Sequence, residues 1–208
     1  MDINALHTFP MWQFLEQYAD GWQLGESGVL AHLVQTKTAE WGELIEIGGG
    51  DGVGLPLSLG TSYNEDRRLI VYEADDEARA SLEAVYPDAT IRGMFTADSI
   101  AELPRNPAAI VIDVDGPDII IMGAILEAGV RPAILMVEHY DLCGPRAADL
   151  LDVPPPWLLG MSVANAEGQT WCIQSPQIPI INLAQSHGYT PVAYTRYNTI
   201  FVKGLPME

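Results

Sequence analysis

"ELIEIGGGDGVG", which runs from Glu43 to Gly54, joins a short apolar run to a glycine-rich loop. The run from Leu44 to Ile47 predicts a strand, and glycines directly after a first strand allow a tight turn and a close approach of the backbone to a ligand. The dinucleotide fingerprint requires glycines at positions i, i+2 and i+5, but counting from Gly48 places Val53 at the third position. No Gly-Lys-Ser/Thr follows, which excludes a Walker phosphate loop. The loop therefore predicts a nucleotide pocket of another kind.

The acid inside this loop indicates the charge of the ligand. A pyrophosphate at a helix N-terminus binds bare backbone N–H groups, and the carboxylate of Asp51 would repel it. A ligand that carries an ammonium and a sulfonium group would instead be attracted by Glu46 and Asp51. S-adenosylmethionine is such a ligand, and Glu73, which follows the second predicted strand, can accept hydrogen bonds from both hydroxyls of its ribose. The G-x-G-x-G pattern with these acids favours a methyl-donor site over the alternative, a tight turn without a ligand.

Apolar runs alternate with helical stretches along the rest of the chain. The two strongest predicted strands are "AAIVIDVDG" (Ala108 to Gly116) and "PAILMVEHYD" (Pro132 to Asp141), and their continuous apolar character suits strands that are covered on both faces. A helix predicted from Ile119 to Ala128 connects them. The alternation predicts an α/β fold with a Rossmann-like, doubly wound, mostly parallel sheet. "TPVAYTR" and "TIFVK" then predict a hairpin at the sheet edge.

Length and charge limit the function classes. The chain has 208 residues, with 28 acidic against 10 basic residues and a net charge of −18. No basic stripe could neutralise a phosphate backbone, which argues against nucleic acid and anionic membranes as partners. Two cysteines do not indicate a disulfide scaffold, and neither a signal peptide nor a membrane-spanning stretch is visible. A cytoplasmic setting is the expectation, and assembly into a homo-oligomer is left open.

The order of the motifs is similar to that of a known family. "ELIEIGGGDGVGLPLS", "LIVYEAD" and "IVIDVDGPD" resemble the class I S-adenosylmethionine-dependent methyltransferases, and within them the FkbM-type group and its relatives with an Asp-x-Asp-Gly strand end. "WQLGESGVLAHLV" is similar to the helix before the first strand of those relatives, and "VEHYD", "INLAQSHGYTPVA" and "NTIFVK" resemble their closing elements. The resemblance implies a seven-stranded sheet with an antiparallel C-terminal hairpin and the transfer of a methyl group. The acceptor is expected to be a small-molecule or glycan-type hydroxyl, or an amine.

The patterning of the chain and the resemblance together predict its organisation. Residues 1–208 are expected to form a single methyltransferase-like domain. Within it, helical spacing predicts N-terminal helices in residues 1–36, which pack on the domain, act as a lid or contact a partner subunit. Residues 144–179 are expected to be a loop-rich insertion that contributes to the acceptor region.

Cofactor-binding residues follow from the motifs and the resemblance together. Asp98, in "FTADSI", lies where such proteins often contact the adenine amine, although a helix N-cap is an equal alternative. The residues predicted to bind the cofactor are Glu46, Gly48, Gly50, Asp51, Gly52, Glu73, Asp98 and Asp113.

Catalytic candidates follow the two strongest predicted strands. Methyl transfer requires an acceptor atom aligned with the methyl group, and an alcohol or amine acceptor must also lose a proton. His139 is a natural base because its ordinary pKa is about 6.5, but strand alternation can turn Glu138 and His139 to opposite faces. Asp115 also has an alternative as an ordinary turn residue. The residues predicted to be catalytic are His139, Asp115 and Glu138.

Three other interpretations stay open at this point. Asp113, Asp115 and Glu138 could form a divalent-cation site, although carboxylates are also common neighbours of a cationic cofactor, so no metal is assigned. The Asp-x-Asp pair also occurs in metal-dependent glycosyltransferases that use a nucleotide sugar, but that function leaves the glycine loop and Glu73 unexplained. A non-catalytic cofactor-binding module on the same fold is the third interpretation.

Overall fold

The computed structural model describes residues 26–37, 42–54, 57–62, 67–139, 162–164, 170–172, 177–195 and 197–204. Its main sheet contains the strands β1 (Leu44–Ile47), β2 (Leu69–Tyr72), β3 (Thr90–Arg92), β4 (Ala109–Ile112), β5 (Ile134–Glu138), β8 (Tyr189–Tyr194) and β9 (Asn198–Lys203). The helical elements are α2 (Glu26–Lys37), η2 (Gly60–Ser62), α3 (Asp76–Val85), α4 (Ala97–Glu102), α5 (Asp118–Glu127) and α6 (Gln177–Ser186). The strands β6 (Ser162–Ala164) and β7 (Thr170–Cys172) form a separate antiparallel pair.

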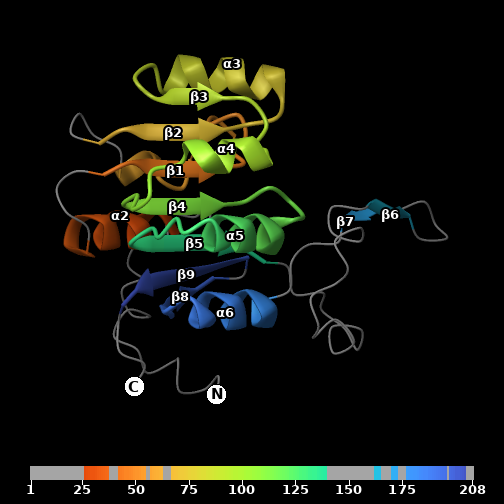
Figure 1. Ribbon diagram of the computed structural model, residues 1–208. Helices are drawn as coiled ribbons and strands as arrows, with labels where there is room; N and C mark the ends of the chain where they lie inside the picture. The colour runs from red at the N-terminus through yellow and green to blue at the C-terminus, as the bar shows by residue number, and fades with distance from the viewer. Residues whose placement is uncertain are drawn as a thin grey trace.

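The strand order of the main sheet is β3-β2-β1-β4-β5-β9-β8 (Figure 1). The first five strands of this order run parallel, whereas β9 lies antiparallel to β5 and β8 antiparallel to β9. The order reverses between β1 and β4, and in doubly wound sheets ligands bind beyond the carboxyl ends of the strands at this point. The predicted seven-stranded sheet with an antiparallel C-terminal hairpin is therefore confirmed.

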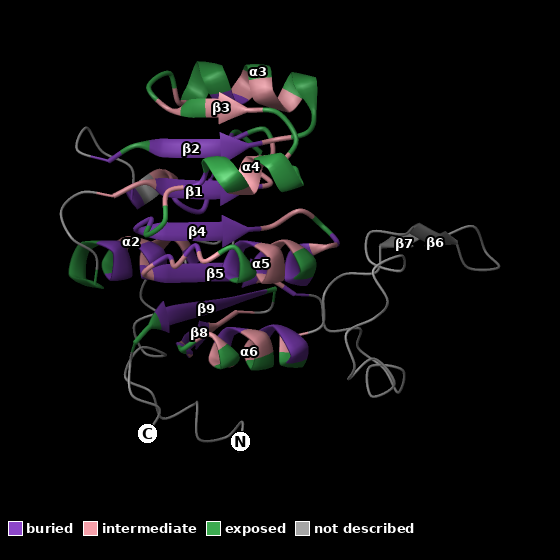
Figure 2. Ribbon diagram, viewed as in Figure 1, coloured by how far each residue is buried: buried purple, intermediate pink, exposed green. Residues whose placement is uncertain are grey.

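Two apolar cores lie on the two faces of this sheet. Side chains alternate along each strand, so that Leu44 packs into the core with α2, whereas Ile45 packs into the core with α5 and α6. The strands β1, β2 and β4 are buried at every position (Figure 2). Burial on both faces explains why these strands are continuously apolar in sequence.

The structure departs from the sequence predictions mainly at the ends of elements. The predicted strand that reaches Gly116 ends earlier, at Ile112, before the polar turn that contains Asp115. The predicted strand that reaches Asp141 ends at Glu138, and residues 140 and 141 lie outside the described residues. Helix α4 was anticipated only in the alternative interpretation of Asp98 as a helix N-cap. Residues 1–25 of the predicted N-terminal segment 1–36 lie outside the described residues. Most of the predicted insertion 144–179 also lies outside them. None of the described helices is long and apolar enough to cross a membrane.

Candidate functional site

A cleft of about 560 Å³ lies at the carboxyl ends of β1, β2 and β4, where the strand order reverses. Six of the predicted site residues line it: Glu46, Gly48, Gly50, Glu73, Asp113 and Asp115. Lining residues that sequence reasoning did not identify include Ser58, Tyr72, Met94, Phe95 and Ile121. Met94, Phe95 and Ile121 are apolar, and such side chains carry no sequence signal that separates a ligand-facing position from a core position.

Three glycines of the loop have a positive φ, and two of them also lie close to other parts of the structure. Gly48 has φ +93°, and a Cβ atom there would lie 1.6 Å from the carbonyl oxygen of Asp113. A Cβ at Gly52, with φ +68°, would lie 2.8 Å from a methyl group of Leu82 on α3. Gly50 has φ +56°, and within the described part of the chain a Cβ there would meet no atom within 4 Å. Gly48 and Gly52 thus allow close packing, whereas Gly50 borders open space in the cleft.

Asp51 closes its own turn. Its Oδ1 atom accepts hydrogen bonds from the N–H groups of Val53 at 2.9 Å and Gly54 at 2.8 Å. Neither Asp51 nor Gly52 is among the residues that line the cleft. The structure therefore gives Asp51 a local role in the loop, and its predicted contact with the cofactor stays a prediction.

Glu46 is a buried acid on the floor of the cleft. Its carboxylate accepts hydrogen bonds from the N–H groups of Ser58 at 2.7 Å and Leu59 at 2.9 Å. Burial raises the pKa of Glu46 to about 8, the two backbone donors oppose that shift, and the nearby charge of Asp113 adds to it. A positive ligand above this carboxyl would favour its ionised form.

Glu73 follows β2 and presents its carboxylate to the cleft. The Gly50 N–H donates to Glu73 Oε2 and the Asp75 N–H donates to Glu73 Oε1, each at 2.8 Å. A carboxylate oxygen can accept two hydrogen bonds, so each oxygen keeps one acceptor site. The carboxylate is thus fixed in position and can still accept a pair of hydroxyl donors.

Asp113 and Glu138 form a hydrogen-bonded carboxyl pair at the ends of β4 and β5. Burial raises the pKa of both groups, and the charges of neighbouring acids, that of Asp113 first, raise the pKa of Glu138 further. Two carboxyl groups in this arrangement share a proton rather than both ionising. Asp113 lines the cleft. Glu138 is not among the lining residues, but it is hydrogen bonded to Asp113.

Asp115 lies in a tight turn. The sequence predicted a turn here as one alternative, but not the acid that stabilises it. The φ of 55° at Asp115 is the only positive φ found at a non-glycine residue in the described chain, and such backbone strain is often stored at functional sites. Asp118 holds the turn, because its carboxylate accepts hydrogen bonds from the N–H groups of Val114 at 2.9 Å and Gly116 at 3.1 Å. Asp118 is completely buried, and burial raises its pKa to about 7. This acid was missed, although its position three residues after Asp115 was visible in the sequence.

His139 lies apart from the cleft. The residue is 1% exposed, and its Nε2 atom lies 3.2 Å from the side-chain nitrogen of Gln177, the first residue of α6. Its backbone N–H donates to the carbonyl of Tyr197. Glu138 contacts Asp113 instead, so the two adjacent side chains lie in different surroundings, as strand alternation allows. His139 is not among the residues that line the cleft, and its catalytic role stays a prediction.

Asp98 lies in the first turn of α4 and does not line the cleft. The N-cap of this helix is Thr96, whose N–H donates to Ser99 Oγ at 3.1 Å, so the alternative interpretation of Asp98 as an N-cap is wrong. Met94 and Phe95, just before α4, border the cleft in its place.

The divalent-cation site that the sequence left open at Asp113, Asp115 and Glu138 stays an open interpretation. Among the residues that the structure describes, no three His, Cys, Asp or Glu side chains form a group that could hold a metal ion.

The strand order and the antiparallel C-terminal hairpin define a Rossmann-like fold of the kind found in methyltransferases. More particularly, the chain is similar in structure to class I S-adenosylmethionine-dependent enzymes. The sugar N-methyltransferase KedS8 from Streptoalloteichus matches with a TM-score of 0.55 and 13% identity over 92% of each chain. An O-methyltransferase from Bacillus cereus, solved in complex with S-adenosylhomocysteine, matches with a TM-score of 0.55 and 15% identity over 96% of this chain and 91% of that one.

A third solved structure extends this likeness. Magnesium protoporphyrin IX methyltransferase from Synechocystis, with bound S-adenosylhomocysteine, matches with a TM-score of 0.50 and 13% identity over 97% of this chain and 92% of that one. At these identities the likeness establishes the fold. No family model and no curated protein matches the sequence.

The buried acids predict that the protein loses stability as the pH rises. The pKa of Glu46 is about 8 in the folded state against an ordinary value of 4.5, so over this range the folded protein keeps a proton that the unfolded chain releases. The free energy of unfolding should therefore fall from about pH 4.5 to about pH 8 and level off above, by a few kcal/mol at about 1.4 kcal/mol per pKa unit. The raised pKa values of Asp113 and Asp118 act in the same direction.

Urea unfolding at about pH 5.5 and about pH 8.5 would measure this slope. The Glu46→Gln variant, which cannot ionise, should show a flatter dependence than the wild type. Glu43→Gln, at the other end of the same strand, is the matched control and should keep the wild-type slope. An identical slope in the wild type and Glu46→Gln would contradict the assignment.

Proposed function

We propose that the chain is an S-adenosylmethionine-dependent methyltransferase that acts on a small-molecule or glycan-type hydroxyl or amine. The observation that carries this proposal is Glu73, whose fixed carboxylate faces the cleft with one acceptor site open on each oxygen. A ribose with two adjacent hydroxyls is a suitable partner for such an acid at the end of the second strand.

The charge of the cleft supports a cationic cofactor. Its described lining contains Glu46, Glu73, Asp75, Asp113 and Asp115, but no lysine, arginine or histidine. The ionised acids among them would repel an anionic diphosphate, whereas they would attract the sulfonium and ammonium groups of S-adenosylmethionine.

The residues at the ends of β4 and β5 suit the chemistry of the acceptor. Methyl transfer from a sulfonium is an in-line displacement that needs alignment and exclusion of water, together with a base for a protonated acceptor. Asp113, hydrogen bonded to Glu138, is the group of this pair that borders the cleft and can take up that proton. The cofactor supplies the methyl group, and these residues hold the acceptor and its proton. The resemblance of the sequence to the FkbM-type group within these methyltransferases stays a prediction.

A thermal-shift experiment tests the cofactor directly. S-adenosylhomocysteine at about 100 times its dissociation constant should stabilise the folded protein by about 2.7 kcal/mol and raise the melting temperature by several degrees. UDP with Mn²⁺ should have no such effect. Stabilisation by UDP–Mn²⁺ alone would favour a glycosyltransferase, whereas cofactor binding without turnover of any hydroxyl or amine acceptor would favour a non-catalytic module.

A further inference from the structure

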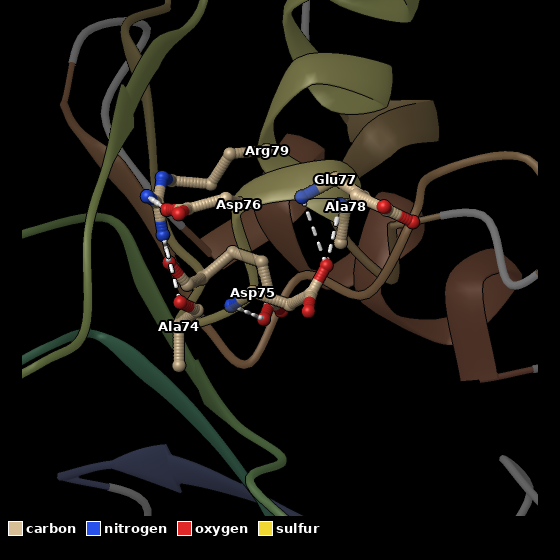
Figure 3. Close-up of polar contacts among 7 residues, drawn as sticks. Ala74, Asp75, Asp76, Glu77, Ala78 and Arg79 are labelled. Atoms are coloured by element: carbon tan, nitrogen blue, oxygen red, sulfur yellow. Dashed lines mark hydrogen bonds and ion pairs between the residues drawn. The ribbon is translucent and has the colours of Figure 1, made fainter.

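Glu73 begins the turn between β2 and α3, residues 73–75, and its carboxylate is held from two sides. Its carboxylate is fixed by the two backbone donors of Gly50 and Asp75. Asp75 also caps α3, because its Oδ1 atom accepts hydrogen bonds from the N–H groups of Glu77 at 2.9 Å and Ala78 at 2.8 Å. Figure 3 shows these contacts at the start of the helix. The side chain of Glu73 is therefore placed by the conformation of this turn.

Arg79 contacts the same turn from the first turns of α3. Its Nη1 atom donates to the carbonyl oxygens of Glu73 at 2.9 Å and Ala74 at 2.8 Å, and its Nη2 atom forms an ion pair with Asp76 (Figure 3). The planar guanidinium group thus donates to two successive backbone carbonyls. Such a fork is rigid and always charged, which suits it to fixing a backbone conformation.

This arrangement separates Arg79 from the ligand itself. Arg79 does not line the cleft, whereas Glu73, Ala74, Asp75 and Ala78 do. Its side chain is about one quarter exposed, and Asp76 is almost fully exposed, so the ion pair alone stabilises little. The two carbonyl contacts are the part of the interaction that reaches the cleft, because those carbonyls belong to lining residues.

We propose that Arg79 is a positioning residue that orients the Glu73 carboxylate for bidentate recognition of a cis-diol. The inference rests on the proposed function, in which that diol is the ribose of the cofactor. Each oxygen of Glu73 has one open acceptor site, so both hydroxyls are recognised only while the carboxylate keeps its present orientation. Loss of Arg79 frees the carbonyls of residues 73 and 74, and the turn then holds the carboxylate less firmly.

The experiment compares S-adenosylhomocysteine with its 2′-deoxy counterpart by isothermal titration calorimetry. In the wild type, loss of one hydroxyl that donates to a carboxylate should weaken binding by about tenfold to one hundredfold. In Arg79→Met the ratio of the two dissociation constants should fall about tenfold toward one. Arg79→Lys, which keeps one donor group and the charge, should give an intermediate ratio.

Arg68→Met is the matched control, because Arg68 lies at the opposite end of β2 and pairs with Glu43 at 3.8 Å. It should leave the ratio unchanged. A purely structural role of Arg79 would weaken both ligands equally, so an unchanged ratio in Arg79→Met and Arg79→Lys overturns the inference. If the wild type binds neither ligand, the proposed function fails; if it binds both and discriminates between them, only the role of Arg79 is being tested.

Discussion

Replacing Gly48 with alanine should remove about 4 kcal/mol or more of folding free energy, a large share of the roughly 5–15 kcal/mol that stabilises a typical domain. The added Cβ atom would lie 1.6 Å from the carbonyl oxygen of Asp113, far inside any contact distance, and the residue has φ +93°. The neighbouring atom is backbone at the end of β4, so it cannot move aside as a flexible side chain would. Relief would require β1 and β4 to separate at the cleft.

Urea unfolding followed by circular dichroism would measure this loss, with Gly93→Ala as the matched control. Gly93 follows β3, and in the described chain an added Cβ there meets no atom within 4 Å and no positive φ opposes it. The control should change the unfolding midpoint little, whereas Gly48→Ala should unfold at much lower urea or fail to fold. Equal midpoints for the two variants would show that the β1–β4 contact is not as tight as the structure indicates.

The sheet could be predicted from the sequence because its strands carry their own signal. β4 and most of β5 are buried on both faces, and only an apolar run can occupy such a position. The glycine loop could also be predicted, since Gly48 packs so closely against the backbone of Asp113 that a side chain is excluded, and Gly52 has a positive φ and lies close to Leu82. Both features depend on steric contact, and the size and polarity of a residue decide which contacts it can make.

The directions of polar side chains were harder to predict. Asp51 turns back onto the N–H groups of its own loop, and His139 faces α6 rather than the cleft. Both outcomes depend on which neighbour offers a partner in the folded chain, and a single sequence does not contain that information. Glu73 was placed correctly beside the cleft because the end of a strand fixes its position, whatever its side chain contacts.

The acids of the cleft also connect ligand binding to pH. Burial and mutual repulsion raise the pKa values of Glu46 and of the Asp113–Glu138 pair, and among the residues described around the cleft no basic side chain offsets this. A bound cation would favour the ionised forms, so binding of a cationic cofactor should release protons. The same groups that destabilise the empty protein at high pH would therefore attract the ligand.

Replacing Glu73 with alanine should weaken the binding of S-adenosylhomocysteine by about one hundredfold or more, because two hydrogen bonds to a charged group are lost and each contributes about 1.5–3 kcal/mol. The variant also removes the acceptor of the Gly50 and Asp75 N–H groups, so the loop and the turn lose a shared contact. Calorimetric titration would measure the dissociation constant, and a urea midpoint would show how much stability is lost at the same time. Glu77→Ala is the control, since Glu77 is exposed in the first turn of α3 and does not line the cleft. Equal affinity in both variants would show that the ribose does not bind the Glu73 carboxylate.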